Sequence, residues 1–123
     1  MGEAPTVLIV DDEMLIGMAL ADELNSHGFC VKGPFGTTAT AQTASEGDLP
    51  DIAFLDVNLG KGRTSHAFAN WLLDQDVPVV FLTGYSKLPP SDPKFRKLPV
   101  LSKPVSITKL IETIDSTLGK RPA

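Results

Sequence analysis

Apolar residues occur along the chain in short continuous runs, separated by longer stretches in which they recur with helical spacing. Three runs are clear, at residues 6–10, 52–55 and 77–82, and two shorter ones lie at 29–31 and 99–101. Continuous runs, rather than runs that alternate with polar residues, are typical of parallel strands covered on both faces. The pattern therefore predicts a parallel sheet of five strands.

Segments with helical spacing lie between these runs and after the last of them. The clearest is 107–118, where Ser106 or Thr108 is placed to cap the start and Gly119 to stop the helix. Further helices are predicted at 13–27 and around Phe68 and Trp71, with a weaker one at 38–46. Alternation of strands and helices predicts a doubly wound α/β domain.

One connection departs from this alternation. A helix is expected between the fourth and fifth runs, but Pro89, Pro90 and Pro93 stand within five residues of one another there. Prolines at this spacing exclude a regular helix across them, because each lacks an amide hydrogen and disfavours helical backbone in the residue before it. The fourth helix is therefore predicted to be short or irregular.

Composition and charge narrow the class of protein. The 123 residues are 42% hydrophobic and 21% charged, which suits one globular domain spanning 1–123. A net charge of −4 argues against general binding of nucleic acid or an anionic membrane, which requires a basic surface. Cys30 is the only cysteine, which excludes an intrachain disulfide, and it is expected to be a small buried hydrophobe. His66 is expected to be solvated.

Neither a membrane span nor a secretory signal is apparent, so a cytoplasmic protein is expected.

Polar residues suited to catalysis or ligand binding stand at the ends of four of the predicted strands. Carboxyl ends of parallel strands meet at one edge of a sheet, where open α/β sheets bind their ligands, so these residues are expected to converge. They are Asp11 and Asp12 (followed by Glu13) after the first strand, Asp56 after the third, Thr83 after the fourth and Lys103 after the fifth.

Each of these residues alone has an ordinary structural explanation. Asp12 is placed to cap a helix, Asp56 to begin a turn, and Lys103 to lie in solvent. Together, however, three clustered carboxylates repel one another unless a cation is bound. A few hard oxygen ligands suit Mg²⁺, whose coordination is often completed by a phosphate. A lysine and a threonine beside them are suited to bind phosphoryl oxygens.

Several common phosphate-binding and hydrolytic sites are excluded. Nucleotide-binding α/β domains cradle phosphate with glycine, serine and threonine amides after the first strand, whereas residues 11–14 here would repel a bare phosphate. The sequence contains no G-x-G-x-x-G loop, no Walker loop and no G-x-S-x-G elbow.

The combined motif resembles the receiver domain of two-component response regulators. Asp56 lies 44 residues after Asp12, Thr83 27 residues further on, and Lys103 another 20 residues beyond, so the resemblance covers about residues 6–119. It implies a flavodoxin-like fold with strand order 2-1-3-4-5 and a role in phosphorelay signal transduction rather than as an enzyme. Phosphohistidine of a sensor histidine kinase or phosphotransfer protein would be the donor, and the downstream partner would be a protein of unknown identity, not nucleic acid or membrane.

The resemblance also assigns a role to each site residue. Asp56 would be the phosphoacceptor, Thr83 the switch hydroxyl and Lys103 the phosphoryl-binding lysine, joined to Pro104 by a cis peptide. Asn58 and Tyr85 would tune hydrolysis of the acyl phosphate. The implied Mg²⁺ ligands are Asp11, largely through water, Asp12, Asp56 and the backbone carbonyl of Asn58.

Two features depart from the common receiver pattern. Val100 occupies the position of the usual switch aromatic, and the fourth helix contains the prolines described above. Residues 81–86 are similar to the motif of FAT GUY receivers, which share both departures and are commonly single-domain regulators in alphaproteobacterial stress signalling. By this resemblance the sequence is identified as a member of that subfamily.

Two other functions remain open. One is an interaction domain of the same fold that works without phosphorylation, and the complete set of site residues argues against it. The other is a small Mg²⁺-dependent phosphatase with an aspartyl nucleophile. Such enzymes usually carry D-x-D after the first strand, whereas Asp11 and Asp12 are adjacent.

Overall fold

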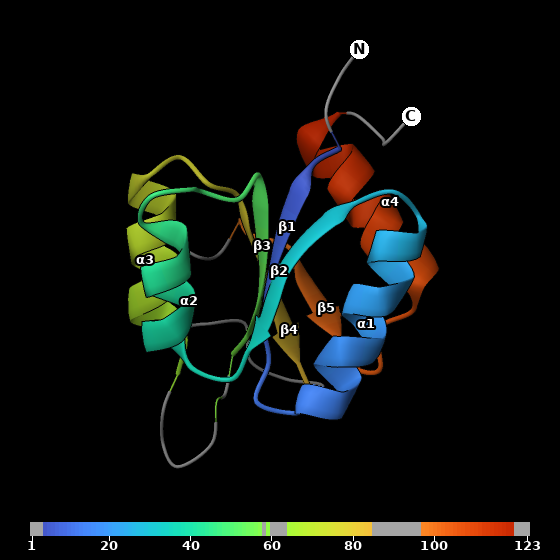
Figure 1. Cartoon of the computed structure of the whole chain (residues 1–123), viewed down its shortest axis with the longest axis horizontal. Helices are drawn as coiled ribbons and strands as arrows, with labels where there is room; N and C mark the ends of the chain where they lie inside the picture. Colours follow the sequence, from blue (N-terminus) through green and yellow to red (C-terminus); the bar gives the residue numbers. More distant parts are fainter. Residues whose placement is uncertain (1–3, 58, 60–63, 85–96, 120–123) are drawn as a thin grey trace.

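A five-stranded parallel sheet with two helices on each face forms the protein (Figure 1). The structure is a computed structural model that describes residues 4–57, 59, 64–84 and 97–119. The strand order is β2-β1-β3-β4-β5, which confirms the predicted doubly wound, flavodoxin-like topology. The strands are β1 (Thr6–Val10), β2 (Cys30–Phe35), β3 (Ile52–Asp56), β4 (Val79–Thr83) and β5 (Val100–Ser102). The helices are α1 (Met14–Ser26), α2 (Thr38–Ser45), α3 (His66–Asp74) and α4 (Ile107–Leu118).

Alternate residues of the central strands belong to two separate cores. On β1, Leu8 and Val10 pack in the core that includes residues of α2 and α3. Val7 and Ile9 pack in the core that includes residues of α1 and α4. Both faces of β1 are therefore covered by helices and excluded from solvent, which explains why the strand sequence contains no alternating polar residues.

The ends of α4 follow from its sequence. The Ser106 hydroxyl accepts a hydrogen bond of 3.1 Å from the amide of Lys109, so Ser106 rather than Thr108 is the N-cap. Gly119 ends the helix with φ of 72°, a left-handed conformation that glycine adopts without strain. The Ser106 cap fixes the start of α4 a few residues after β5, at the edge of the sheet where the strands have their carboxyl ends.

The first helix approaches β2 unusually closely. Gly17 is buried, and a Cβ atom placed on it would lie 2.8 Å from the Cβ of Pro34. The Gly33–Pro34 peptide is cis, a feature that the sequence analysis did not predict. Because β2 neighbours β1 in the sheet, this contact holds the start of α1 beside the carboxyl end of β1.

Two predictions about single residues are wrong. Cys30 is exposed rather than buried, because it opens β2, a strand at the edge of the sheet. His66 is half-buried rather than solvated: its Nε2 is buried and its ring packs edge-on against Phe81, with centroids 6.0 Å apart. The predicted irregular fourth helix would fall within residues 85–96, which lie outside the described residues. None of the described helices has the length and apolar character needed to cross a lipid bilayer.

Candidate functional site

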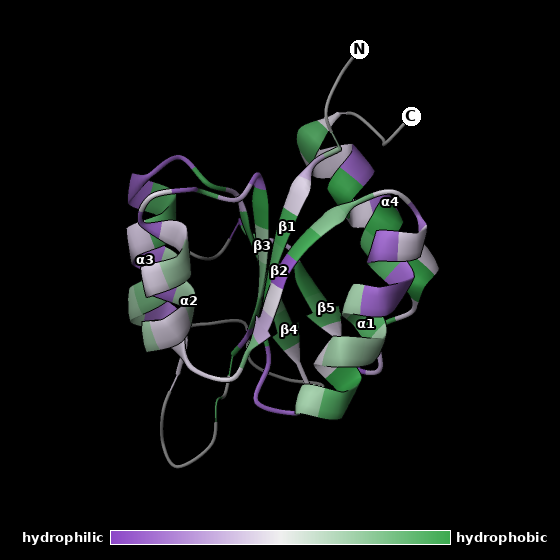
Figure 2. Ribbon diagram, viewed as in Figure 1, coloured by the Kyte–Doolittle hydropathy of each residue, from purple (hydrophilic) through white to green (hydrophobic). Residues whose placement is uncertain are grey.

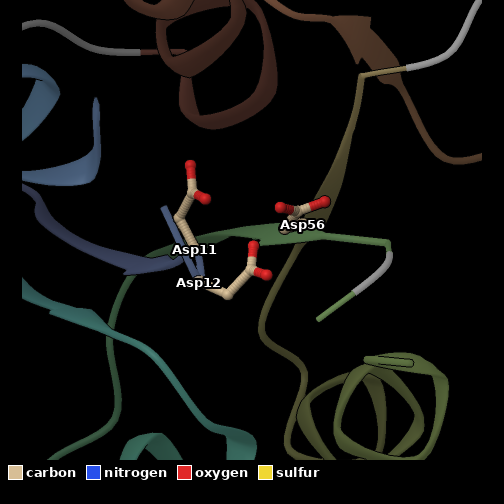
Figure 3. Close-up of side chains that lie close together, drawn as sticks. All are labelled: Asp11, Asp12 and Asp56. Atoms are coloured by element: carbon tan, nitrogen blue, oxygen red, sulfur yellow. The ribbon is translucent and has the colours of Figure 1, made fainter. Parts of the chain in front are cut away.

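Three carboxylates gather at the carboxyl ends of β1 and β3. Asp11 directly follows β1, and Asp56 is the last residue of β3, the neighbouring strand. Register explains their proximity, because Val10 at the end of β1 pairs with Leu55, next to Asp56. One carboxylate oxygen from each of Asp11, Asp12 and Asp56 lies within 4.8 Å of the others (Figure 3). The predicted convergence of these acids is therefore observed.

Lys103 reaches this cluster from the far edge of the sheet. Its amide donates a 2.8 Å hydrogen bond to the carbonyl of Thr83, which continues the pairing of β4 with β5 by one residue. The Nζ atom of Lys103 lies 3.0 Å from Asp11 Oδ1 and 2.9 Å from Asp56 Oδ2. The Lys103–Pro104 peptide is cis, which confirms the prediction.

Burial dominates the electrostatics of Asp56, of which only 6% is exposed. Desolvation raises the pKa of Asp56 to about 6, although the hydrogen bond and charge of Lys103 act in the opposite direction. The charges of Asp11 and Asp12 contribute to the same rise in the pKa of Asp56. At neutral pH the carboxyl group is ionised, which a nucleophile or a metal ligand requires.

Lys103 remains protonated despite its burial. Desolvation lowers its pKa, but hydrogen bonds to Glu13, Asp56 and Asp11 outweigh that effect and hold the pKa above its usual value. One ammonium thus faces several carboxylates, so the site retains an excess of negative charge. A cation would relieve the remaining repulsion.

The donor set fits Mg²⁺. Asp11 is fully buried, and its Oδ2 has no hydrogen-bond partner among the described residues. An ionised oxygen buried in this way is costly unless a cation or a donor meets it. Asp12 is exposed, so a metal held by these oxygens would keep contact with solvent, as Mg²⁺ requires when it retains water ligands. Asn58 lies outside the described residues.

Three further residues, Thr83, Tyr85 and Glu13, have to be placed relative to the site. Thr83 is the last residue of β4 and is 7% exposed, at the same edge of the sheet as Asp56. Tyr85 lies outside the described residues. Glu13 was given no role by sequence reasoning, yet its Oε1 lies 2.9 Å from Lys103 Nζ. Its position directly after the acidic pair was the one available signal.

The chain resembles several known proteins. No protein-family model matches it. The solution structure of SdrG from Sphingomonas melonis Fr1 is 37% identical and aligns with a TM-score of 0.79 over 96% of this chain and 99% of SdrG. A structure of SdrG in its BeF3-activated conformation aligns with a TM-score of 0.77. The response regulator REC domain of PhyR from Erythrobacter litoralis is 31% identical, with a TM-score of 0.80 over 98% of this chain and 95% of that domain.

A further relative is similar to nearly all of this chain but is itself much longer. The transcriptional regulatory protein PdtaR of Mycobacterium tuberculosis is 30% identical over 116 residues, which are 93% of this chain and 57% of PdtaR. The chain thus spans little more than half the length of this relative. The likeness to SdrG and to the PhyR domain extends over nearly the whole of both partners. The chain therefore belongs to the receiver domain family of two-component response regulators.

Proposed function

We propose that Asp56 accepts a phosphoryl group from phosphohistidine of a sensor histidine kinase or phosphotransfer protein, and that this modification switches the binding of a downstream protein. One observation carries the proposal: a buried, ionisable Asp56 lies 2.9 Å from Lys103 Nζ, beside two further carboxylates. The existence of a BeF3-activated conformation of SdrG supports it, because that ligand is a mimic of a phosphoryl group.

The chemistry is an in-line displacement at phosphorus. An ionised oxygen of Asp56 attacks, an oxygen–phosphorus bond forms, and the phosphorus–nitrogen bond breaks with its electron pair returning to the imidazole. Lys103 donates a hydrogen bond to one phosphoryl oxygen, and the Thr83 hydroxyl donates to another. Mg²⁺, held by Asp11, Asp12, Asp56 and the proposed carbonyl of Asn58, would neutralise charge on the phosphoryl oxygens when bound.

An exposed apolar surface beside the site supports a protein as the donor. The start of α1, which follows the acidic loop directly, is coloured as hydrophobic in Figure 2. Leu15 is 83% exposed there and Met18 51%, with Met14 and Ile16 also exposed. Contiguous exposed apolar side chains of this kind mark surfaces that contact other proteins. A donor docked on α1 would place its phosphohistidine over Asp56.

The finer assignments also belong to this proposal. The FAT GUY subfamily rests on residues 81–86, of which 85 and 86 lie outside the described residues. Asn58 and Tyr85 are proposed to tune hydrolysis of the acyl phosphate. We also propose that the protein is cytoplasmic and that, as a signalling receiver, it catalyses only its own phosphorylation and dephosphorylation.

The test is uptake of phosphate from acetyl phosphate in the presence of Mg²⁺, followed by intact mass. The proposal predicts the gain of one phosphate group by the wild type and none by Asp56→Asn. Equal uptake by the two proteins would contradict it. Turnover of an added phosphate ester would favour the phosphatase alternative, and undiminished partner binding by Asp56→Asn under phosphorylating conditions would favour the phosphorylation-independent one.

A further inference from the structure

The ammonium group of Lys103 uses all of its hydrogen-bond donors on carboxylates. A lysine ammonium has three N–H groups. Its Nζ lies 3.0 Å from Asp11 Oδ1, 2.9 Å from Asp56 Oδ2 and 2.9 Å from Glu13 Oε1. A phosphoryl oxygen on Asp56 therefore finds no unused donor on Lys103, and one of the three existing hydrogen bonds has to break before the lysine can serve the phosphoryl group.

The three carboxylates differ sharply in what their release would cost. The side chain of Asp11 is fully buried and that of Asp56 is 8% exposed, whereas that of Glu13 is 56% exposed. A carboxylate at the rim is rehydrated by solvent when it loses its partner, but a buried one stays unpaired. Asp11 already has one buried oxygen without a partner among the described residues. Phosphorylation replaces the charge of the Asp56 carboxylate by a neutral acyl oxygen, so the carboxylates that still compete for Lys103 are those of Asp11 and Glu13. Of these two, the exposed Glu13 is released at lower cost.

We propose that Glu13 is a positioning residue that holds Lys103 in the unphosphorylated site and competes with the phosphoryl group for its ammonium. This inference rests on the proposed function of Asp56. Among the described residues, the Glu13 side chain hydrogen-bonds to Lys103 alone, because the contact of Glu13 with Asp11 comes from its backbone amide, which donates a 2.9 Å hydrogen bond to Asp11 Oδ1. Substitution of the side chain leaves that backbone contact in place.

The competition predicts the effect of removing the Glu13 charge. Glu13→Gln removes the negative charge and so weakens the contact that holds Lys103 in the ground state, and the phosphorylated form gains relative stability. Ion pairs with an exposed partner are weak, so the dissociation constant of beryllofluoride at saturating Mg²⁺ should fall roughly two- to fivefold. Glu23→Gln makes the same change at an exposed position near the other end of α1 and should leave the constant unchanged.

A second variant separates the contact from the general electrostatic field. Glu13→Asp keeps the negative charge but shortens the side chain by one methylene, which takes its oxygens out of hydrogen-bond reach of Lys103. The proposal predicts that Glu13→Asp, like Glu13→Gln, binds beryllofluoride more tightly than the wild type. If Glu13→Asp behaves like the wild type while Glu13→Gln binds more tightly, the field alone is responsible and the contact carries no competition.

A spectroscopic measurement follows the exchange directly. In the wild type, the carboxylate ¹³C resonance of Glu13 should move when beryllofluoride and Mg²⁺ are added, because Lys103 leaves Glu13, while that of Glu23 should not. An unchanged Glu13 resonance, or equal affinities of Glu13→Gln and wild type, overturns the inference and leaves the phosphoacceptor proposal standing. Failure of the wild type to bind beryllofluoride at all overturns both.

Discussion

Substitution of Asp56 by asparagine should make the metal-free protein more stable at neutral and alkaline pH. Asparagine resembles the neutral acid in shape, so the variant removes the burial penalty of the charged form and keeps the volume. The pKa of Asp56 is raised from 3.8 to about 6 by burial. At about 1.4 kcal/mol per pH unit, the ionised carboxylate destabilises the fold by about 3 kcal/mol above pH 6.

The sign of the pH dependence follows from the same shift. Above pH 6 both the folded and the unfolded chain carry an ionised Asp56, and the advantage of Asp56→Asn is complete. Between pH 6 and pH 4 the folded state retains the proton that the unfolded state has released, so the wild type gains stability as the pH falls. Below pH 4 both states are protonated and the advantage disappears.

Urea unfolding at a series of pH values, without Mg²⁺, measures this difference. Thermal unfolding is a second measurement. At pH 8 the midpoint temperature of Asp56→Asn should exceed that of the wild type by roughly 10 °C for a domain of this size. Asp22→Asn, at an exposed position on α1, is the control and should change stability by less than about 0.5 kcal/mol. Saturating Mg²⁺ should reduce the difference, because the metal stabilises only the wild-type carboxylate cluster. A variant less stable than the wild type at pH 8 would refute the reasoning.

Three further predictions test the metal site, the packing and the donor surface. Asp12→Ala should weaken Mg²⁺ binding roughly tenfold or more by calorimetric titration, and an unchanged affinity would remove the proposed ligand. Gly17→Ala should lower the free energy of unfolding by about 1–3 kcal/mol, because its Cβ would lie 2.8 Å from that of Pro34; the gain usual for a helical glycine would contradict this close packing. Leu15→Glu should slow phosphorylation by a histidine kinase about tenfold but not that by acetyl phosphate, and equal slowing would exclude α1 as the docking surface.

The sheet was predictable because its central strands are buried on both faces. Residues 6–10 form β1 with the predicted bounds, and Ser106 and Gly119 end α4 as the capping rules indicate. The strand β2 ends at Phe35, further along the chain than the predicted run 29–31. It includes Lys32, a charged residue that the apolar pattern does not mark as part of a strand. The Lys32 Nζ donates to the carbonyl of Ala44 in α2, a tertiary contact that compensates for a charged residue in the sheet.

The candidate site was predictable to the extent that topology determines it. Asp11 and Asp56 meet because neighbouring parallel strands end at one edge, a consequence of strand order alone. The partner of Glu13 was not predictable, since Lys103 lies 90 residues away and the contact depends on side-chain reach. Exposure of Cys30 depends likewise on which strands lie at the edges of the sheet, and single-residue hydrophobicity carries no such information.

The central claim is that Asp56, and no other carboxylate of the cluster, carries the phosphoryl group. Borohydride reduction of the phosphorylated protein converts a phosphorylated aspartate to homoserine, which peptide mapping assigns to a residue. After incubation with Mg²⁺ and acetyl phosphate or a cognate kinase, the account predicts homoserine at position 56 alone. Homoserine at position 11 or 12 instead, or at none of the three under conditions that phosphorylate a control receiver domain, would contradict it.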